Sequence, residues 1–268
     1  MSKILITGGD GFIGGYLRNY LSKQHQVYAP GRSLLDLTNL HSVNTFFDNN
    51  QVDTVIHCAL IGRNNTNGVD DQLTVGNLNM FANLYRNKHK FTTLINMGTG
   101  NEFDTTCNND GSPEITLFDR MPVSSYAYSK NLIARTISDT ENMYNLRLFG
   151  VFGAKEINTR FFKRLKLATE AFHIFQDHKF DFLWVEDLFP IIDLVLAGNM
   201  PWRDINCVYP KKYLLSEMSY LFAQINNVNS DLIKVDARSQ INFSGDATRL
   251  ASLNLPLKGL EAGFDSYV

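Results

Sequence analysis

Lys3-Ile-Leu-Ile-Thr-Gly-Gly-Asp-Gly-Phe-Ile-Gly14 is the stretch that decides the fold of this chain. Its first five residues are mostly apolar or β-branched and end at glycines, which is typical of a fully buried strand. The residues after the glycines carry an apolar stripe at helical spacing, which predicts a helix: Phe12, Ile13, Tyr16, Leu17, Tyr20 and Leu21. The glycines therefore lie at a turn from a strand into a helix.

The spacing of these glycines predicts a phosphate-binding turn. Gly9, Gly11 and Gly14 fit the pattern G-x-G-x-x-G, and Gly8, Gly11 and Gly14 fit G-x-x-G-x-x-G. Glycine lacks the Cβ that would keep the backbone away from a pyrophosphate. The N–H groups and the positive end of the following helix then hold the anion. We predict that the dinucleotide is bound by Gly8, Gly11, Phe12, Ile13 and Gly14.

Strands and helices alternate along the first 150 residues. After the first pair we expect strands at 26–29, 52–59, 92–97 and 144–149. We expect helices at 38–47 with Thr38 as N-cap, at 70–87, and from Ser124 or Ser125 to about Glu141. A long polar loop is expected at 100–123. This alternation favours an α/β fold with a Rossmann-like, doubly wound parallel sheet.

Beyond residue 150 the alternation of strands and helices becomes less regular. Residues 158–169 are basic and amphipathic. Later strands are expected at 171–175, 181–185 and 205–209, and later helices at 186–196 and 216–226. We expect a dinucleotide-binding core at 1–150, completed by about 184–210. Residues 151–183 and 211–268 are expected to form a small substrate-binding part, because ligands of such folds lie beyond the carboxyl ends of the strands.

Composition narrows the possible functions. The net charge is −2, with no basic run, which argues against a nucleic-acid partner. The 3 cysteines are scattered, which predicts neither a disulfide framework nor a metal site and suits a reducing cytoplasm. The sequence shows no signal peptide, and the apolar stretch at 191–197 is too short for a membrane span. We therefore expect a cytoplasmic protein with no membrane partner.

A second motif, Tyr126-Ala-Tyr-Ser-Lys130, predicts proton transfer. Tyr126 and Lys130 are four residues apart on an expected helix, so they share one face. A free tyrosine has a pKa near ~10, and a neighbouring ammonium brings that pKa closer to neutral pH. The motif is weak alone and gains weight from its place between the fourth and fifth strands. Tyr128 competes with Tyr126 but lies on a different face.

The chain resembles the extended short-chain dehydrogenases/reductases that act on nucleotide sugars, within the NAD(P)-dependent epimerase/dehydratase family. Within this family it is most similar to the sugar-nucleotide reductases and epimerases, over nearly its whole length. The matching segments are Thr7 to Gly14, His57-Cys-Ala59, Ile95-Asn-Met-Gly-Thr99, Tyr126 with Lys130, Leu146-Arg-Leu-Phe-Gly-Val-Phe-Gly153 and Trp184-Val-Glu-Asp-Leu188.

The resemblance implies a role for each catalytic residue. Tyr126 would be the proton donor to a sugar carbonyl, and Lys130 would bind the nicotinamide ribose and tune Tyr126. Thr99 would hydrogen-bond the reacting oxygen. Four further cofactor contacts are implied: Cys58 and Ala59 beside the cofactor, and Asp36 and Leu37 near the adenine. The resemblance also implies a homodimer formed through the 70–87 helix and the Tyr126 helix.

The end of the second strand indicates the cofactor. An acid there would bind a ribose 2′-hydroxyl and repel a 2′-phosphate. Here the run is Tyr28-Ala-Pro-Gly-Arg-Ser33, without an acid, and Arg32 could pair with a phosphate. NADP(H) is favoured, with NAD(H) as the alternative.

The residues after Thr99 bear on the reaction. Dehydratases of the family carry Asp-Glu directly after this threonine, and fucose-synthase-like members carry a cysteine two residues after it. Here Gly100 and Asn101 follow, and Glu102 comes one position late. What remains is reduction of a nucleotide-linked 4-keto-6-deoxy sugar or, alternatively, 4-epimerisation with bound cofactor. A non-catalytic NADP-binding sensor is a lesser alternative.

Substrate binding departs from the family pattern. Members often carry an arginine for the nucleotide diphosphate where this chain has Phe180. Other polar residues would have to bind the substrate, and our candidates are Asn158, Arg160 and Lys179.

Overall fold

The computed structural model describes residues 1–61 and 71–267. The chain divides into two compact units. Unit 1 consists of Met1–Asp104, Ile115–Arg147 and Asp193–Ile205, and unit 2 consists of Thr105–Glu114, Leu148–Ile192 and the chain from Asn206 onward.

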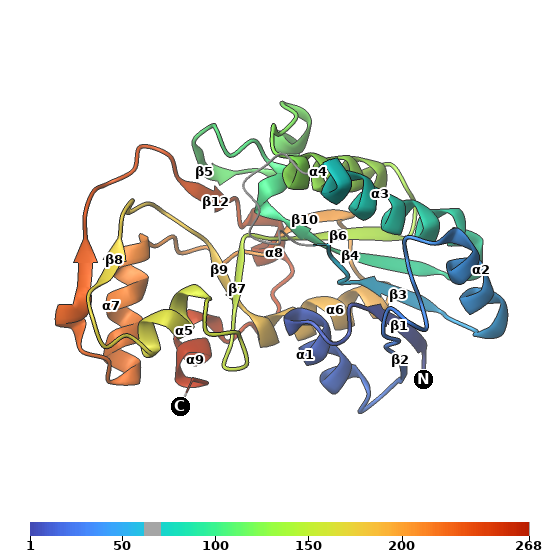
Figure 1. Cartoon of the computed structure of the whole chain (residues 1–268), viewed down its shortest axis with the longest axis horizontal. Helices are drawn as coiled ribbons and strands as arrows, with labels where there is room; N and C mark the ends of the chain where they lie inside the picture. The colour runs from blue at the N-terminus through green and yellow to red at the C-terminus, as the bar shows by residue number, and fades with distance from the viewer. Residues whose placement is uncertain (62–70, 268) are drawn as a thin grey trace. The chain divides into compact units, whose positions relative to one another are not determined.

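Unit 1 is built on a six-stranded parallel sheet in the order β10-β6-β4-β3-β1-β2 (Figure 1). This arrangement confirms the α/β, Rossmann-like fold predicted from the sequence. The strands are β1 (Lys3–Thr7), β2 (Gln26–Tyr28), β3 (Thr54–His57), β4 (Thr93–Thr99), β6 (Met143–Leu148) and β10 (Asp204–Asn206). The helices are α1 (Phe12–Leu21), α2 (Leu40–Asn49), α3 (Asp71–Arg86) and α4 (Ser125–Ser138), with α6 (Leu188–Leu196) crossing the boundary between the units.

One face of this sheet is covered by α3 and α4 (Figure 1). Leu5, Val55 and Leu94 are register partners on neighbouring strands and are fully buried under these helices. Helix α3 contributes Phe81 and Leu84 to the same cluster. Each such side chain stabilises the fold by roughly 1.5–3 kcal/mol relative to exposure. On the opposite face of the sheet lie α1 and the part of α6 that belongs to unit 1.

Several element boundaries differ from the prediction. Helix α2 is capped by Asn39, whose side chain accepts from the Ser42 N–H (3.2 Å), and not by Thr38. The hydroxyl and the N–H of Thr38 instead both donate to Asp36. Ser124 caps α4 as expected. Strand β3 is shorter than predicted, and the expected start of α3 at Asp70 lies outside the described residues.

The predicted loop at 100–123 was wrong in its middle. It contains β5 (Asn109–Ser112), which pairs with β12 (Phe243–Gly245), and two short 3-10 helices, Gly100–Glu102 and Glu114–Phe118. A polar strand with its partner more than 100 residues away carries no hydrophobic periodicity, so the sequence pattern missed it.

Unit 2 is assembled from three two-stranded sheets and short helices (Figure 1). Its centre is aromatic, with Phe162 contacting Phe152, Phe222 and Phe264 at ring distances of 5.2, 5.3 and 4.7 Å. The remaining elements are β7 (Gly150–Phe152), α5 (Phe161–Lys166), β8 (Phe172–Ile174), β9 (Phe182–Trp184), α7 (Leu215–Asn226), β11 (Ile233–Val235), α8 (Thr248–Ser252) and α9 (Gly259–Asp265). Unit 2 also has 3-10 turns at Val185–Asp187 and Ser230–Leu232, and unit 1 has one at Lys88–Lys90.

The three cysteines are free thiols. Among the described helices, none combines the length and the apolar character that crossing a membrane requires.

Candidate active site

The turn between β1 and α1 requires glycine at two positions. Gly8 has a φ of +67°, and a Cβ there would lie 2.8 Å from the Ala59 backbone. A Cβ on Gly14 would lie 2.3 Å from the Gly8 carbonyl oxygen. Gly11 is the N-cap of α1 and offers no side chain to the first N–H groups of the helix. The positive end of the helix dipole at this N-terminus favours an external anion.

A cavity of about 230 Å³ opens beside this turn at the carboxyl ends of β1, β2 and β3. Six of the predicted cofactor residues line it: Gly8, Gly11, Arg32, Asp36, Leu37 and Ala59. Four others are placed elsewhere, since Phe12, Ile13 and Gly14 form the first turn of α1 and Cys58 lies just past β3. The sequence did not single out Ile61 and Met80, which also line the cavity.

Arg32 and Asp36 lie at the mouth of this cavity as a loose ion pair. The Arg32 Nε is 3.4 Å from an Asp36 oxygen, and the Arg32 side chain is 75% exposed. Hydrogen bonds from the Thr38 hydroxyl and N–H lower the pKa of Asp36, and the charge of Arg32 lowers it further. Asp36 is therefore ionised and held in place by Thr38, whereas the exposed Arg32 side chain can turn toward another anion.

The end of β3 carries two buried groups that remain neutral. Burial lowers the pKa of His57 to about 3, and the positive charge of Lys130 contributes. The imidazole instead forms a hydrogen bond with the Thr7 hydroxyl at 2.8 Å. Burial raises the pKa of the Cys58 thiol to about 12, although Lys130 opposes this. Both groups shape the strand end and do not titrate near neutral pH.

Tyr126, Thr99 and Lys130 all lie in unit 1, and the pKa of Tyr126 is raised, not lowered as expected from Lys130. Burial raises the pKa of Tyr126, a hydrogen bond with the Thr99 side chain lowers it, and the charge of Glu102 raises it. The Lys130 ammonium donates to the Met97 carbonyl oxygen at 3.0 Å. Burial lowers the pKa of Lys130, whereas Glu102 and Cys58 raise it. The competing Tyr128 is exposed on α4.

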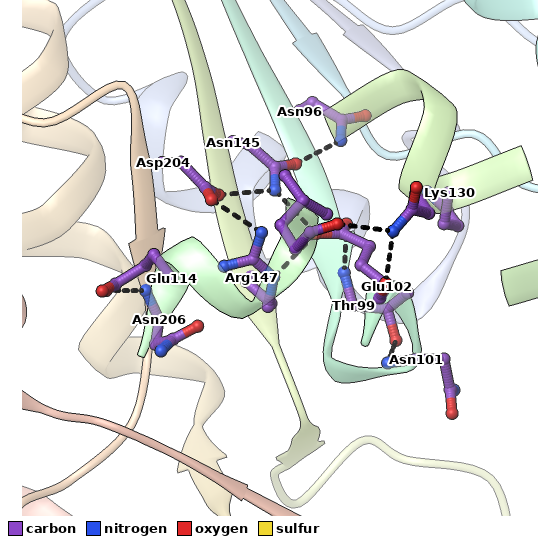
Figure 2. Close-up of polar contacts among 12 residues, drawn as sticks. Asn96, Thr99, Asn101, Glu102, Glu114, Lys130, Asn145, Arg147, Asp204 and Asn206 are labelled. Carbon is purple, nitrogen blue, oxygen red and sulfur yellow. Dashed lines mark hydrogen bonds and ion pairs between the residues drawn. The ribbon is translucent and has the colours of Figure 1, made fainter. Parts of the chain in front are cut away.

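Sequence reasoning missed a buried ionic cluster behind Thr99, shown in Figure 2. Arg147 on β6 lies between Glu102 (2.8 Å) and Asp204 (2.7 Å), and the side chains of Arg147 and Glu102 are completely buried. Asn145 donates to both carboxylates at 2.9 Å. One signal was present, because Thr99-x-x-Glu102 is the capping-box pattern.

The candidate substrate residues of unit 2 are placed as follows. Asn158 is exposed. Arg160 donates to the Val151 carbonyl oxygen and lies 3.8 Å from Glu156. Lys179 pairs with Asp110 at 3.0 Å, with both side chains about 40% exposed. Arg160 and Lys179 are thus held by the protein itself, on the surface.

No group of three or more metal-binding side chains is present among residues 1–61 and 71–267.

Solved structures with the same architecture cover almost the entire chain. A GDP-mannoheptose C4 reductase from Campylobacter jejuni with NADP bound has a TM-score of 0.84 at 18% identity, covering 99% of this chain and 96% of that one. A dTDP-4-dehydrorhamnose reductase from Bacillus anthracis in complex with NADP has a TM-score of 0.78 at 18% identity, covering 99% and 97%. A dTDP-glucose 4,6-dehydratase from Bacillus anthracis in complex with NAD has a TM-score of 0.77 at 15% identity, covering 100% and 95%.

No curated protein sequence matches the chain significantly. The sequence profile of one family matches residues 4–207, which include the glycine turn, Thr99, Tyr126, Lys130 and the buried cluster. The match spans more than half of the chain, and the fold and the site agree with it. The chain therefore belongs to the NAD dependent epimerase/dehydratase family.

Proposed function

We propose that this protein is an NADP(H)-dependent oxidoreductase that reduces the keto group of a nucleotide-linked 4-keto-6-deoxy sugar. The observation that carries the proposal is that the Thr99 side chain acts on the Tyr126 phenol, in the unit that also holds Lys130 and the glycine turn. Two of the structures with the same fold are reductases of nucleotide-linked sugars with NADP, which supports this kind of reaction.

The residues present fit a dinucleotide. At Gly8 and Gly14 the backbone leaves no room for a Cβ, and the open N-terminus of α1 faces the same turn. The adjacent cavity carries Arg32 for a phosphate and the apolar Leu37 and Met80 for a flat ring. When bound, the reduced nicotinamide supplies the hydride that the carbonyl carbon receives.

The protein itself supplies the proton, from Tyr126, and the neighbouring groups that set the pKa of this phenol. Because burial raises the pKa of Tyr126, the phenol carries its proton at neutral pH and can donate it to the carbonyl oxygen. The hydrogen bond with Thr99 then stabilises the phenolate that remains. Lys130 places a positive charge beside the end of β3.

Glu102 argues against water elimination, although a dehydratase shares the fold. One carboxylate oxygen accepts from the Thr99 N–H (2.8 Å), and the other accepts from Asn145 and Arg147. Since Glu102 is completely buried and committed to these donors, it is not placed to transfer protons to a substrate.

The proposal is tested by incubating the protein with NADPH and a panel of GDP-, CDP-, dTDP- and UDP-linked 4-keto-6-deoxy sugars, followed by mass spectrometry. A product that has gained two hydrogens supports reduction. An isomer of unchanged mass would indicate 4-epimerisation instead. NADPH binding without turnover of any substrate would favour a non-catalytic sensor.

Arg32→Ala is expected to weaken the binding of NADPH but not that of NADH. A charge-assisted hydrogen bond contributes roughly 1.5–3 kcal/mol, so the Kd for NADPH should rise about 10- to 100-fold while that for NADH changes little. Arg203→Ala, at an exposed arginine of the same unit outside the cavity lining, is the matched control. Fluorescence titration with both cofactors measures this difference. Equal weakening of NADPH and NADH would mean that Arg32 does not read the 2′-phosphate.

We further propose that the protein forms a homodimer through α3 and α4. A largely apolar groove of about 360 Å³ runs between these helices, lined by Leu78, Phe81, Ala82, Tyr85, Arg86, Leu132, Ile133 and Thr136. The family resemblance implies that a second copy occupies this face.

Ala82→Arg should produce a monomer, because it places a long charged side chain in the groove. Asn79→Arg, at an exposed position of α3 outside the groove, should leave the dimer intact. Light scattering after size-exclusion chromatography gives the mass of each variant. A wild-type protein that is monomeric at micromolar concentration would contradict the proposal.

A further inference from the structure

Thr99 is held by a reciprocal pair of hydrogen bonds with the 3-10 turn that follows it. Its hydroxyl oxygen accepts from the Asn101 N–H at 3.3 Å, and its own N–H donates to a Glu102 oxygen at 2.8 Å. The Thr99 hydroxyl accepts from Asn101, and its own O–H can still donate to another acceptor. The Thr99 side chain also acts on Tyr126, because hydrogen bonding to Thr99 lowers the pKa of the phenol.

Glu102 is itself locked from the opposite side. Its second oxygen accepts from Arg147 Nε (2.8 Å) and Asn145 Nδ2 (2.9 Å), as Figure 2 shows. Arg147 is in turn held by Asp204 and lies over the Phe103 ring, 4.5 Å from its centre. Burial raises the pKa of Glu102, and the charge of Arg147 opposes this rise. The three groups that donate to its oxygens are N–H groups, which matches an ionised carboxylate. These contacts hold both oxygens of the Glu102 carboxylate and so fix its orientation.

The backbone leaves space for this carboxylate. A Cβ on Gly98 would lie 2.5 Å from a Glu102 oxygen and 2.6 Å from the Asn145 oxygen. Burying two carboxylates and a guanidinium costs several kcal/mol per ion in desolvation, and apolar packing of the same volume is often at least as stable. Stability is thus a poor reason for such a cluster directly behind a reacting group.

We propose that Glu102, clamped by Arg147, is a positioning residue that aims the Thr99 hydroxyl at Tyr126. This inference rests on the proposed reductase function. Glu102 does not touch the substrate in this role and acts only through Thr99.

The charge of Glu102 has a second effect on the site. It raises the pKa of Tyr126, in the same direction as burial, and so favours the protonated phenol that a reductase needs. Activity is therefore present below the pKa of Tyr126 and lost as the pH rises through it. Without the Glu102 charge, that loss moves to lower pH. The other titratable groups around Glu102 and Lys130 are Arg147, Asp204, Cys58 and His57.

Glu102→Gln tests this inference, with Asp204→Asn as the matched control. Asp204 is the other carboxylate on Arg147, is almost as buried, and accepts hydrogen bonds from Arg147 and Asn145. We expect E102Q to lower kcat about 10²-fold through misplacement of Thr99, with little change in KM. Its alkaline loss of activity should shift to lower pH, whereas D204N, which leaves the Glu102 contacts to Thr99 in place, should lower kcat far less and shift the pH profile far less.

An independent readout separates this inference from the proposed function. Ultraviolet titration of tyrosinate, taken as the difference between each protein and its Tyr126→Phe counterpart, reports the phenol without any substrate. E102Q should lower the midpoint of that titration even if no keto sugar is turned over by the wild type. If the wild-type protein turns over no keto sugar but E102Q still lowers the Tyr126 midpoint, only the proposed function is overturned.

A variant that keeps the charge completes the test. Glu102→Asp retains the carboxylate but is one methylene too short to reach Thr99, so kcat should fall while the Tyr126 midpoint stays near that of the wild type. Equal effects of E102Q and D204N, or unchanged kcat and midpoint in E102Q, would overturn the inference. Failure of both Glu102 variants to fold would do the same, because it would assign Glu102 to stability.

Discussion

Replacing Tyr126 with phenylalanine is expected to lower kcat about 10²- to 10⁴-fold, the usual contribution of a positioned general acid. The ring stays the same size, so packing of α4 should survive. The loss would follow from the missing phenol proton, which the Thr99 hydrogen bond and the burial of Tyr126 prepare for transfer. The affinity for NADPH should remain near that of the wild type.

The control is two residues away on the same helix. Tyr128 is 41% exposed, so Tyr128→Phe should leave kcat unchanged. The wild-type rate should fall as the pH rises through the pKa of Tyr126, and the residual rate of Tyr126→Phe should not follow that titration. Steady-state kinetics across pH with a substrate from the panel, together with NADPH fluorescence titration, provide both measurements. A Tyr126→Phe protein with wild-type kcat would eliminate Tyr126 as the acid.

Gly14→Ala is expected to abolish measurable NADPH binding, with an increase in Kd of at least about 100-fold. The new Cβ would lie 2.3 Å from the Gly8 carbonyl oxygen, so the turn that approaches the pyrophosphate must open. Such overpacking against backbone should also lower the free energy of unfolding by about 1–3 kcal/mol.

The neighbouring glycine is a matched control. A Cβ on Gly15 would lie 3.7 Å from the Gly9 carbonyl oxygen, which is an ordinary contact. Because Gly15 is inside α1, Gly15→Ala should stabilise the helix by roughly 0.5–1 kcal/mol and leave NADPH binding intact. Thermal unfolding and fluorescence titration separate the two effects. NADPH binding by Gly14→Ala at wild-type strength would show that this turn is not the phosphate site.

Local patterns were enough to predict the parts of the fold that depend on local physics. The β1 strand, the glycine turn and α1 follow each other within twenty residues, so hydrophobic spacing and glycine chemistry determine them. The same holds for Ser124 as the cap of α4, and for Tyr126 and Lys130 on one helix. Tyr126 and Lys130 keep their predicted roles as proposals, because binding and turnover have to test them.

Features that depend on distant partners escaped the sequence. Strand β5 exists only through its pairing with the distant β12. The wrong cap at Thr38 is a local effect, because Asn39 accepts from Ser42 while Thr38 donates to the nearby Asp36. Hydrophobic periodicity carries no information about either contact.

The sequence by itself determined the parallel sheet and its glycine turn, and it predicted the threonine, tyrosine and lysine that we propose for a dinucleotide reaction. Tertiary structure alone decided that Glu102, Arg147 and Asp204 form one buried cluster behind Thr99. The physical reason is that a buried charge is tolerable only beside its counter-charge, and here Arg147 lies 45 residues from Glu102 and 57 residues from Asp204 in the chain.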